Sequence, residues 1–404
     1  MTYAQIIVLG NGFDLVQGIP SSYDDFFNYR YKQYQDDNNS INSLLPKISE
    51  QSLDNGYCIW DYLFAFWHDS EKELHEWKNV ESAIKEWVVG TGTISLTDAI
   101  SYWEAASKCN DAQSHNYAFD VQSVYDLIKC YLSDKIDFSV LDIFANKENN
   151  LQDSNKQESI DEFRKETLDI FASELHVIED AFADYLDKAV KYNYSYEPAC
   201  HATYVRICEA GGTNIPLEKQ SNSILSFNYT VPLSLFKEPS VHYIQNVHGD
   251  LARREDELLS NRPYHVIFGF DSQSHMDDPS VYQFTKTARI LTLEPQHKLD
   301  GMQEFSLFDA QKNGGNIAEI KFFGHSLGEA DYSYFQSLFD RVDLYGSDIK
   351  LTFCGTKKHP ANKDAIIQLI TKYSKTITPQ EHGHNLLHKL RFEGRLKIEE
   401  ISPL

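Results

Sequence analysis

Five short segments combine glycine with side chains that can bind a ligand or move a proton. The first, Gly10-Asn11-Gly12-Phe13-Asp14, directly follows the apolar run at residues 6–9. A Gly-x-Gly after a strand lets the backbone approach a ligand closely, and the helix that follows offers its N-terminal amides to an anion. The segment is not a G-x-G-x-x-G fingerprint, because residue 15 is leucine. A tight turn without a ligand is therefore the alternative interpretation.

The next two segments carry an amide and an imidazole. Asn228, in Ser226-Phe227-Asn228-Tyr229-Thr230, offers a donor and an acceptor, which suits ribose hydroxyls or a carboxamide. An asparagine that caps a turn is the alternative. His248 precedes Gly249-Asp250, and a histidine at a strand end beside a glycine can act as a general base near pH 7. A loop histidine held by ordinary hydrogen bonds is the alternative.

The last two segments are Phe268-Gly269-Phe270-Asp271 and residues 323–331. The second contains Gly324-x-Ser326-x-Gly328, which fits the literal pattern of a serine hydrolase nucleophile elbow. An elbow needs an acidic residue and then a histidine later in the chain. The candidates for these places are Asp331 or Asp340 and His359 or His384. No loop suited to an oxyanion hole is evident, so a serine hydrolase at Ser326 is the weaker alternative.

These segments follow expected β-strands. Short apolar runs predict strands at residues 6–9, 223–227, 241–247, 265–269, 318–323 and 350–354. One helix is expected at about residues 26–34 and another at residues 332–339, with Asp331 as its N-cap. Strands that alternate with helices predict an α/β domain with a parallel sheet, where ligands bind at the carboxyl ends of the strands.

Between residues 35 and 220 the pattern changes to that of amphipathic helices. Apolar residues recur at three- and four-residue spacing around residues 60–67, 80–87 and 163–186. The polar, Asn-rich stretch at residues 146–157 predicts a loop. The predicted organisation is therefore an α/β domain formed by residues 1–34 and 221–404, split by a long, mostly helical insertion at residues 35–220.

The 404-residue chain carries 37 Lys and Arg against 60 Asp and Glu, a formal net charge of −23. Nucleic acids and anionic membranes are not expected as partners, because both select clustered basic residues. No apolar run is long enough to span a membrane, no signal peptide is recognisable, and the six cysteines are scattered, so a cytoplasmic protein is expected. No metal is expected, because His384 with His388, and Cys200-His201 with Cys208, lack complete ligand sets.

Together the segments resemble a known family. Gly10-Asn11-Gly12-Phe13-Asp14 and Gly18-Ile19-Pro20-Ser21-Ser22-Tyr23-Asp24-Asp25-Phe26 closely resemble the opening of the AbiH family of bacteriophage abortive-infection proteins. Later motifs of that family are similar, in the same order, to residues 226–230, Val247-His248-Gly249 and the run from Gly324-His325-Ser326-Leu327 to Asp331-Tyr332. The resemblance covers nearly the whole chain and implies a bacterial antiviral defence protein.

The same segments resemble, more distantly, the sirtuin-like NAD-binding fold of the Rossmann type. The matching positions, in sirtuin order, are Gly10, Gly12, Gly18-Ile19-Pro20, Ser226 to Thr230, His248-Gly249, Arg262-Pro263, Phe268-Gly269 and Gly324-His325-Ser326-Leu327. Sirtuins carry four zinc cysteines where residues 249–267 have none. Thr230 replaces a sirtuin aspartate and Tyr23 an arginine. The resemblance therefore implies hydrolysis of NAD to nicotinamide and ADP-ribose, and not deacetylation.

This resemblance implies roles for individual residues, with His248 as the base and Asn228 orienting the nicotinamide ribose and a water. The residues expected to bind the dinucleotide are Gly10, Asn11, Gly12, Phe13, Asp14, Pro20, Ser226, Asp271, Gly324 and Ser326. Because the segments contain no lysine, the pyrophosphate is expected on backbone amides of residues 10–14, with Arg262 as the nearest basic candidate. The alternative is a non-catalytic nucleotide sensor. For an NADase, control by a lid formed from the helical insertion or by self-assembly is expected, and a defence-system protein is the candidate partner.

Overall fold

The computed structural model describes residues 3–34, 44, 56–69, 77–106, 121–141, 153–230, 232–251, 266–271, 278–291, 307–308 and 317–402. The chain divides into two compact units. The first comprises Met1–Ser21, Ala183–Val266 and Thr292–Leu404, and the second comprises Ser22–Phe182 and Ile267–Leu291. Residues 183–220, expected in the helical insertion, belong to the first unit, and residues 267–291, expected in the α/β domain, belong to the second.

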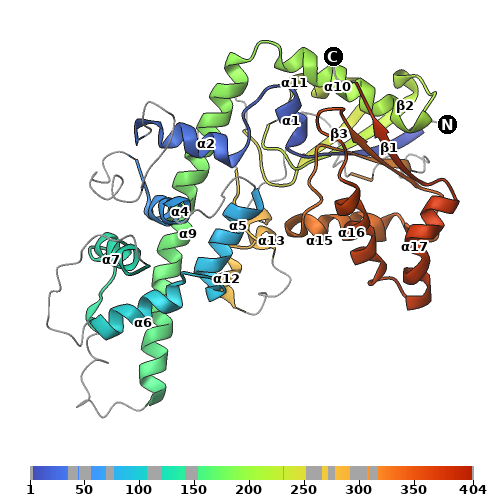
Figure 1. Cartoon of the computed structure of the whole chain (residues 1–404). Helices are drawn as coiled ribbons and strands as arrows, with labels where there is room; N and C mark the ends of the chain where they lie inside the picture. Colours follow the sequence, from blue (N-terminus) through green and yellow to red (C-terminus); the bar gives the residue numbers. More distant parts are fainter. Residues whose placement is uncertain are drawn as a thin grey trace, which may run out of the picture. The chain divides into compact units, whose positions relative to one another are not determined.

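The first unit is built around a six-stranded parallel sheet (Figure 1). Its strands are β1 (Tyr3–Leu9), β2 (Gln220–Ser226), β3 (Val241–Asn246), β4 (Ile317–Phe323), β5 (Lys350–Gly355) and β6 (Leu396–Glu400). Their spatial order is β3-β2-β1-β4-β5-β6. The predicted α/β class is confirmed, as are the first five of these strands. The sequence analysis missed β6, in which charged residues alternate with the apolar ones.

The strand predicted at residues 265–269 is wrong for the part that the structure describes. Residues 266–269 have no regular structure, Phe270 forms only an isolated bridge with Thr285, and residue 265 lies outside the described residues. Backbone groups of this segment form hydrogen bonds outside a sheet. The backbone N–H of Phe268 donates to the Glu179 carboxylate at 2.6 Å, and the backbone carbonyl of Phe270 accepts from the backbone N–H of Lys286. A short buried apolar run cannot by itself distinguish a strand from such a buried loop.

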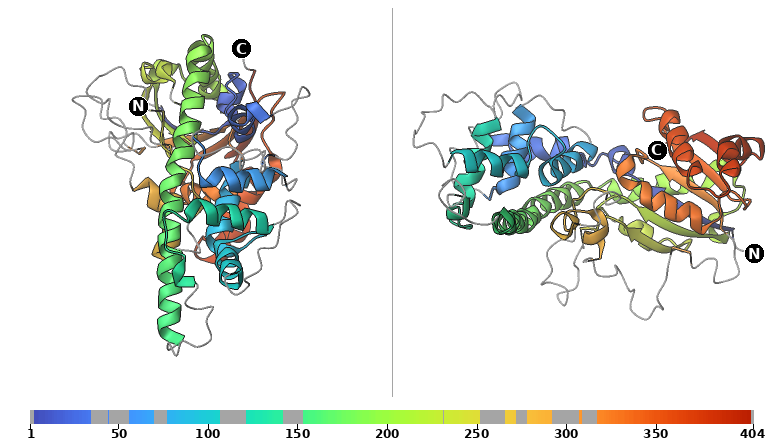
Figure 2. Two further views of the ribbon diagram at one scale, coloured as in Figure 1. Left: turned by 90° about the vertical axis from the view of Figure 1, so that its left-hand side faces the viewer. Right: turned by 90° about the horizontal axis from the view of Figure 1, so that it is seen from below.

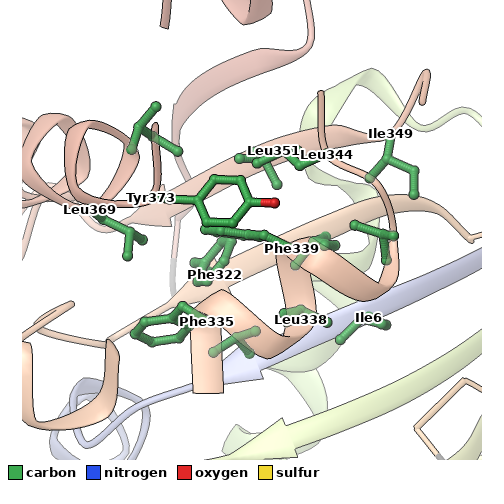
Figure 3. Packing of buried hydrophobic residues seen from close by; sticks show 14 of the residues in the cluster. Ile6, Phe322, Phe335, Leu338, Phe339, Leu344, Ile349, Leu351, Leu369 and Tyr373 are labelled. Carbon is green, nitrogen blue, oxygen red and sulfur yellow. The ribbon is translucent and has the colours of Figure 1, made fainter. Parts of the chain in front are cut away.

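The two faces of the sheet differ in chemistry. One face is apolar and packs against α15 (Tyr332–Arg341), α16 (Lys363–Ser374) and α17 (Gln380–Phe392) (Figures 1 and 2). Ile6 and Phe322 of the sheet meet Phe335, Phe339 and other side chains of these helices in one continuous core (Figure 3). Alternation along each strand sends every second side chain into this core, which is why these positions are apolar.

The opposite face is polar where α10 (Tyr196–Glu209) covers it. Lys321 of β4 is fully buried and donates to the carbonyl groups of Ile207, Cys208 and Ala210 at 2.7–3.1 Å. A lysine thereby caps the carboxyl end of α10, where free carbonyls and the helix dipole favour a cation. The unit also contains α1 (Gly12–Val16), α11 (Leu233–Phe236) and short 3-10 helices at Ala210–Gly212, Leu217–Lys219 and Glu329–Asp331.

The second unit is helical. Its described helices are α2 (Tyr23–Arg30), α4 (Ile59–Asp69), α5 (Trp77–Lys85), α6 (Leu96–Ala106), α7 (Val121–Leu132), α12 (Pro279–Tyr282), α13 (Lys286–Ile290) and most of α9 (Asp153–Tyr192), with short 3-10 and π segments at Lys32–Tyr34 and Glu86–Gly90. The long helix α9 is continuous (Figure 2). It begins at Asp153, so the loop predicted at residues 146–157 is wrong from that residue on.

Aromatic side chains and buried ion pairs hold this unit together. Trp60 packs edge-on against Phe171, with ring centroids 5.3 Å apart. The buried Glu179 receives a hydrogen bond from Arg289 at 2.7 Å, and Asp61 receives two from Arg30.

Within the described residues, no helix is both long and apolar enough to cross a membrane.

Candidate functional site

Four loops with chemistry-bearing residues leave neighbouring strands at one edge of the sheet. Gly10 follows β1, Phe227 follows β2, Val247 follows β3 and Gly324 follows β4. Because β3, β2, β1 and β4 are adjacent and parallel, their carboxyl ends lie side by side. The sheet therefore brings together four of the five segments singled out in the sequence. The fifth, Phe268 to Asp271, belongs to the second unit.

Three glycines allow the loops after β1 and β4 to touch. The amides of Gly10 and Gly12 donate to the carbonyls of Phe323 and Gly324 at 3.0 and 2.8 Å. A Cβ atom at Gly10 would lie 2.4 Å from the Cα of His325, and one at Gly324, whose φ is +70°, would lie 2.5 Å from the Phe13 nitrogen. Glycine is required here for close packing. Both amides are engaged within the protein, so a phosphate would have to displace these hydrogen bonds to reach them.

Asp14 ties the glycine loop to two distant segments. Its carboxylate is buried and accepts hydrogen bonds from the Tyr196 hydroxyl at 2.8 Å and the Thr230 hydroxyl at 2.6 Å. Burial raises the pKa of Asp14 to about 6, although both hydroxyl donors lower it. The side chain thus joins α1, α10 and the loop after β2. This geometry gives Asp14 a direct part in positioning the loops.

His248, Asp331 and His325 form a row of titratable side chains at this edge. The Nε2 atom of His248 lies 3.2 Å from Oδ1 of Asp331, and the Nε2 atom of His325 lies 3.4 Å from Oδ2 of the same carboxylate. The side chains of His248, Asp331 and His325 are only 5%, 14% and 4% exposed. Asp331 occupies the N-cap position of α15 as predicted, but its side chain makes no capping hydrogen bond. It faces the two imidazoles, which the sequence analysis did not predict.

Aromatic rings enclose this row. The Phe227 ring stands edge-on to the imidazoles of His325 and His248, with ring centroids 4.3 and 5.6 Å apart. The centroid of the Tyr334 ring lies 6.0 Å from that of His248. Tyr229 also contacts His248, at 6.2 Å. Such walls exclude water, so an interaction between imidazole and carboxylate is stronger here than at the surface. The Nε2 atom of His248 is itself buried and, although Asp331 is 3.2 Å away, it makes no hydrogen bond among the described residues.

In the chain, Asn228 lies between Phe227 and Tyr229, two of the three aromatic residues that contact His248. Asn228 is 4% exposed. Its backbone N–H donates to the Ser226 hydroxyl, and its backbone carbonyl accepts a hydrogen bond from the Asn246 side chain at 2.6 Å. Among the described residues, the side-chain oxygen of Asn228 has no hydrogen-bond donor. A buried acceptor without a donor is costly, and it is a common feature of sites that a ligand completes. The chemistry of this site therefore fits a ligand that presents a hydroxyl or amide donor.

The remaining predicted binding residues are spread over different environments. Asn11 accepts a hydrogen bond from Ser21 at 2.5 Å, Phe13 is buried against Phe323, and Pro20 is exposed while its carbonyl accepts from Tyr185. Asp271 lies in the second unit, and Arg262 lies outside the described residues.

Ser326 is exposed at the end of the sheet, in a loop without helical structure. The strained residue of this loop is Leu327, with a φ of 59°. In a nucleophile elbow the serine itself sits on the strained turn between a strand and a helix. The literal G-x-S-x-G pattern is therefore not accompanied by the backbone geometry of an elbow.

Two contacts within the candidate site escaped the sequence analysis. Asn246, at the end of β3, donates to the carbonyls of both Asn228 and Thr230 and so holds that loop in place. The sequence analysis named His325 only within a family motif and did not predict its proximity to Asp331. In the described part of the chain, no group of three or more histidine, cysteine, aspartate or glutamate side chains is arranged to hold a metal.

Comparison with known proteins gives one match. The family model described as bacteriophage abortive infection AbiH matches residues 6–353, which include β1 from Ile6 onward, all of β2, β3 and β4, the first part of β5 and the four loops of the site. Comparison with curated proteins and with solved structures gave no match. Since the family model covers most of the chain, the protein belongs to the AbiH family of bacteriophage abortive infection proteins.

Proposed function

We propose that this protein serves anti-phage defence by hydrolysing NAD to nicotinamide and ADP-ribose. Family membership supports the defence role, and the residues at the sheet edge support the chemistry. The observation that carries the proposal is the pairing of His248 with Asp331 beside the buried, donor-free oxygen of Asn228. A base and an acceptor for a sugar hydroxyl are the groups that hydrolysis of an N-glycoside requires.

The topology supports a nucleotide ligand. The order β3-β2-β1-β4-β5-β6 is the order found in doubly wound dinucleotide-binding sheets, and ligands of such sheets bind where the strand order reverses. In this sheet that point lies between β1 and β4, where Gly10, Gly12 and Gly324 meet. A sirtuin-like variant of this fold, split by a mainly helical second unit, is part of the proposal.

The proposed reaction breaks the bond between C1′ of the nicotinamide ribose and the ring nitrogen. The bonding electrons pass to the cationic ring, so nicotinamide leaves as a neutral molecule. Water adds to C1′, and His248 takes the proton that this water releases. Asn228 accepts a hydrogen bond from a ribose hydroxyl and thereby fixes the sugar. NAD is an intracellular substrate, so the proposal places the activity in the cytoplasm, held inactive until infection through self-assembly or a partner protein.

The test is the release of nicotinamide from NAD by the purified protein, with and without phage components. We expect His248→Ala to lower the rate by about 10²–10⁴-fold, which is the usual contribution of a general base. His242→Ala is the matched control, because His242 is exposed on β3, six residues earlier in the chain. A folded protein that binds NAD but never releases nicotinamide would refute hydrolysis and favour the nucleotide sensor.

The serine hydrolase is tested in the same preparation. A fluorophosphonate probe labels an activated serine, and the exposed Ser326 would be its target. We expect no labelling, because the loop lacks the geometry of an elbow. Labelling that disappears in Ser326→Ala would reverse this conclusion.

A further inference from the structure

We propose that the loop after β5, residues 356–362, is the phosphate-binding part of the site, with Lys357 and Lys358 holding the pyrophosphate of the dinucleotide. The inference rests on the proposed function and names the side chains that would neutralise the charge of the ligand. None of the five segments singled out in the sequence contains a lysine, and this loop was not among them. It also lies beyond residues 6–353, which the family model matches.

The sheet places this loop beside the four loops of the site. β5 runs parallel to β4, with Cys354 opposite Phe323, so both strands end at the same edge. Neighbouring strands are about 4.8 Å apart, which puts the carboxyl end of β5 about 5 Å from that of β4 and about 10 Å from that of β1. Asn228 follows β2, on the other side of the point where the strand order reverses. A dinucleotide whose ribose is held by Asn228 can therefore extend its phosphates across that point toward β5.

The pyrophosphate needs charged donors because the backbone amides described at this edge already have acceptors. The amides of Gly10 and Gly12 donate to carbonyls of the loop after β4. At the start of α16, the side chain of Asn362 accepts from the amides of Asp364 and Ala365. Lysine is an ordinary ligand for phosphate, since its ammonium group is a compact charge on a long, flexible stem. The two lysines of the loop can supply what these amides cannot.

The backbone of this loop forms a closed turn that presents both lysines to solvent. The backbone N–H of Thr356 donates to the His359 carbonyl at 2.9 Å, and the backbone N–H of His359 donates to the Thr356 hydroxyl at 3.0 Å. A Cβ atom at Gly355 would lie 2.3 Å from the Ala361 nitrogen, so glycine lets the chain return on itself here. The lysines at the tip are exposed. A turn fixed before the ligand arrives lowers the entropy lost on binding.

The charge of this loop differs from that of the rest of the protein. Among the described residues, neither Lys357 nor Lys358 forms an ion pair, and the first acidic residue after the loop is Asp364. From residue 355 onward the chain has nine Lys and Arg against five Asp and Glu, whereas residues 1–354 have 28 against 55. A local positive region in an acidic protein attracts an anionic ligand to that place. Its position at the edge where ligands of such sheets bind favours the phosphates of a nucleotide.

The experiment is calorimetry of the full-length protein with NAD, ADP-ribose and ADP, which carry phosphates, and with adenosine, which carries none. Replacing both Lys357 and Lys358 by glutamine should weaken binding of the three phosphate ligands by about 10-fold or more at low salt, and should leave adenosine unaffected. The matched control replaces Lys219 and Lys350 by glutamine. This variant loses the same charge, from exposed lysines just before β2 and at the start of β5, at the opposite edge of the sheet.

The control should bind all four ligands as the unaltered protein does. An equal weakening in both double variants would assign the effect to net charge and overturn the inference. Unchanged binding in the variant that lacks Lys357 and Lys358 would overturn it as well, and so would a folded protein that binds none of the phosphate ligands.

Kinetics separate this inference from the proposed hydrolysis. If NAD is cleaved, the loss of both lysines should raise KM much more than it lowers kcat, because the phosphates take no part in the bond that breaks. Cleavage with an unchanged KM in this variant would refute the phosphate site and leave the proposed function standing. Binding of ADP-ribose that depends on the two lysines, in a protein that never releases nicotinamide, would support the phosphate site and refute the hydrolysis.

Discussion

Replacing Asp14 by asparagine tests the electrostatics of the glycine loop. The carboxyl group is 1% exposed and lies between the hydroxyls of Tyr196 and Thr230, with no basic side chain among these partners. Burial therefore outweighs the two hydrogen bonds and raises the pKa of Asp14 from 3.8 to about 6. The substituted amide would keep the shape and the polar contacts of the side chain but could not ionise. The variant thus isolates the free energy of carrying a charge at this position.

The expected magnitude follows from the size of the pKa shift. A rise of about two pH units corresponds to about 3 kcal/mol, at 1.36 kcal/mol for each unit. Between about pH 4 and pH 6 the folded protein holds this proton more strongly than the unfolded chain, so the stabilising contribution of Asp14 falls as the pH rises. We expect Asp14→Asn to match the unaltered protein at pH 4 and to be more stable by about 2–3 kcal/mol at pH 7.

The assay has to report on the unit that contains Asp14. All five tryptophans lie between residues 60 and 103, in the second unit, so their fluorescence does not follow unfolding of the sheet. Hydrogen exchange of peptides from β1 and β2, measured from pH 4 to pH 7 and corrected for intrinsic exchange, follows it directly. Asp348→Asn, which removes an exposed carboxylate of the same unit, is the control. A stability difference that does not change with pH would refute the reasoning.

Two further substitutions probe the frame of the site. Lys321→Met should destabilise the first unit by about 3–5 kcal/mol, because it leaves the last carbonyls of α10 without a donor and Glu319 without its nearby cation; exchange of the β4 peptide measures the loss. Gly324→Ala should lower the free energy of unfolding by at least about 1–2 kcal/mol, because the φ of Gly324 is +70° and an added Cβ would meet Phe13. Gly328→Ala is the control and should be almost neutral, because the φ of Gly328 is −65°. Thermal unfolding of both variants measures the difference.

The elements that the sequence predicted are those whose signal is local. Five of the six predicted strands are correct because apolar residues cluster over a few positions, and the loops that follow them share the same edge in any parallel sheet. The contacts within the site are not local. The Asp14 carboxylate receives hydrogen bonds from Tyr196, which is 182 positions away in the chain, and from Thr230, which is 216 positions away. No pattern around residue 14 could therefore have identified these donors. Lys321 is equally hidden, since a charged residue within a strand normally predicts an exposed face.

Asp331 shows why a correctly predicted element can still conceal the contacts that its residues make. An aspartate directly before a helix predicts a cap, and the helix does begin at Tyr332. Whether the carboxylate turns back to the helix or outward depends on the backbone of the four residues before it, and Leu327 enters the left-handed region there without any sequence signal such as glycine or asparagine. The local pattern fixes where the helix starts. The tertiary arrangement of the loops after β2, β3 and β4 decides that this carboxylate meets two histidines.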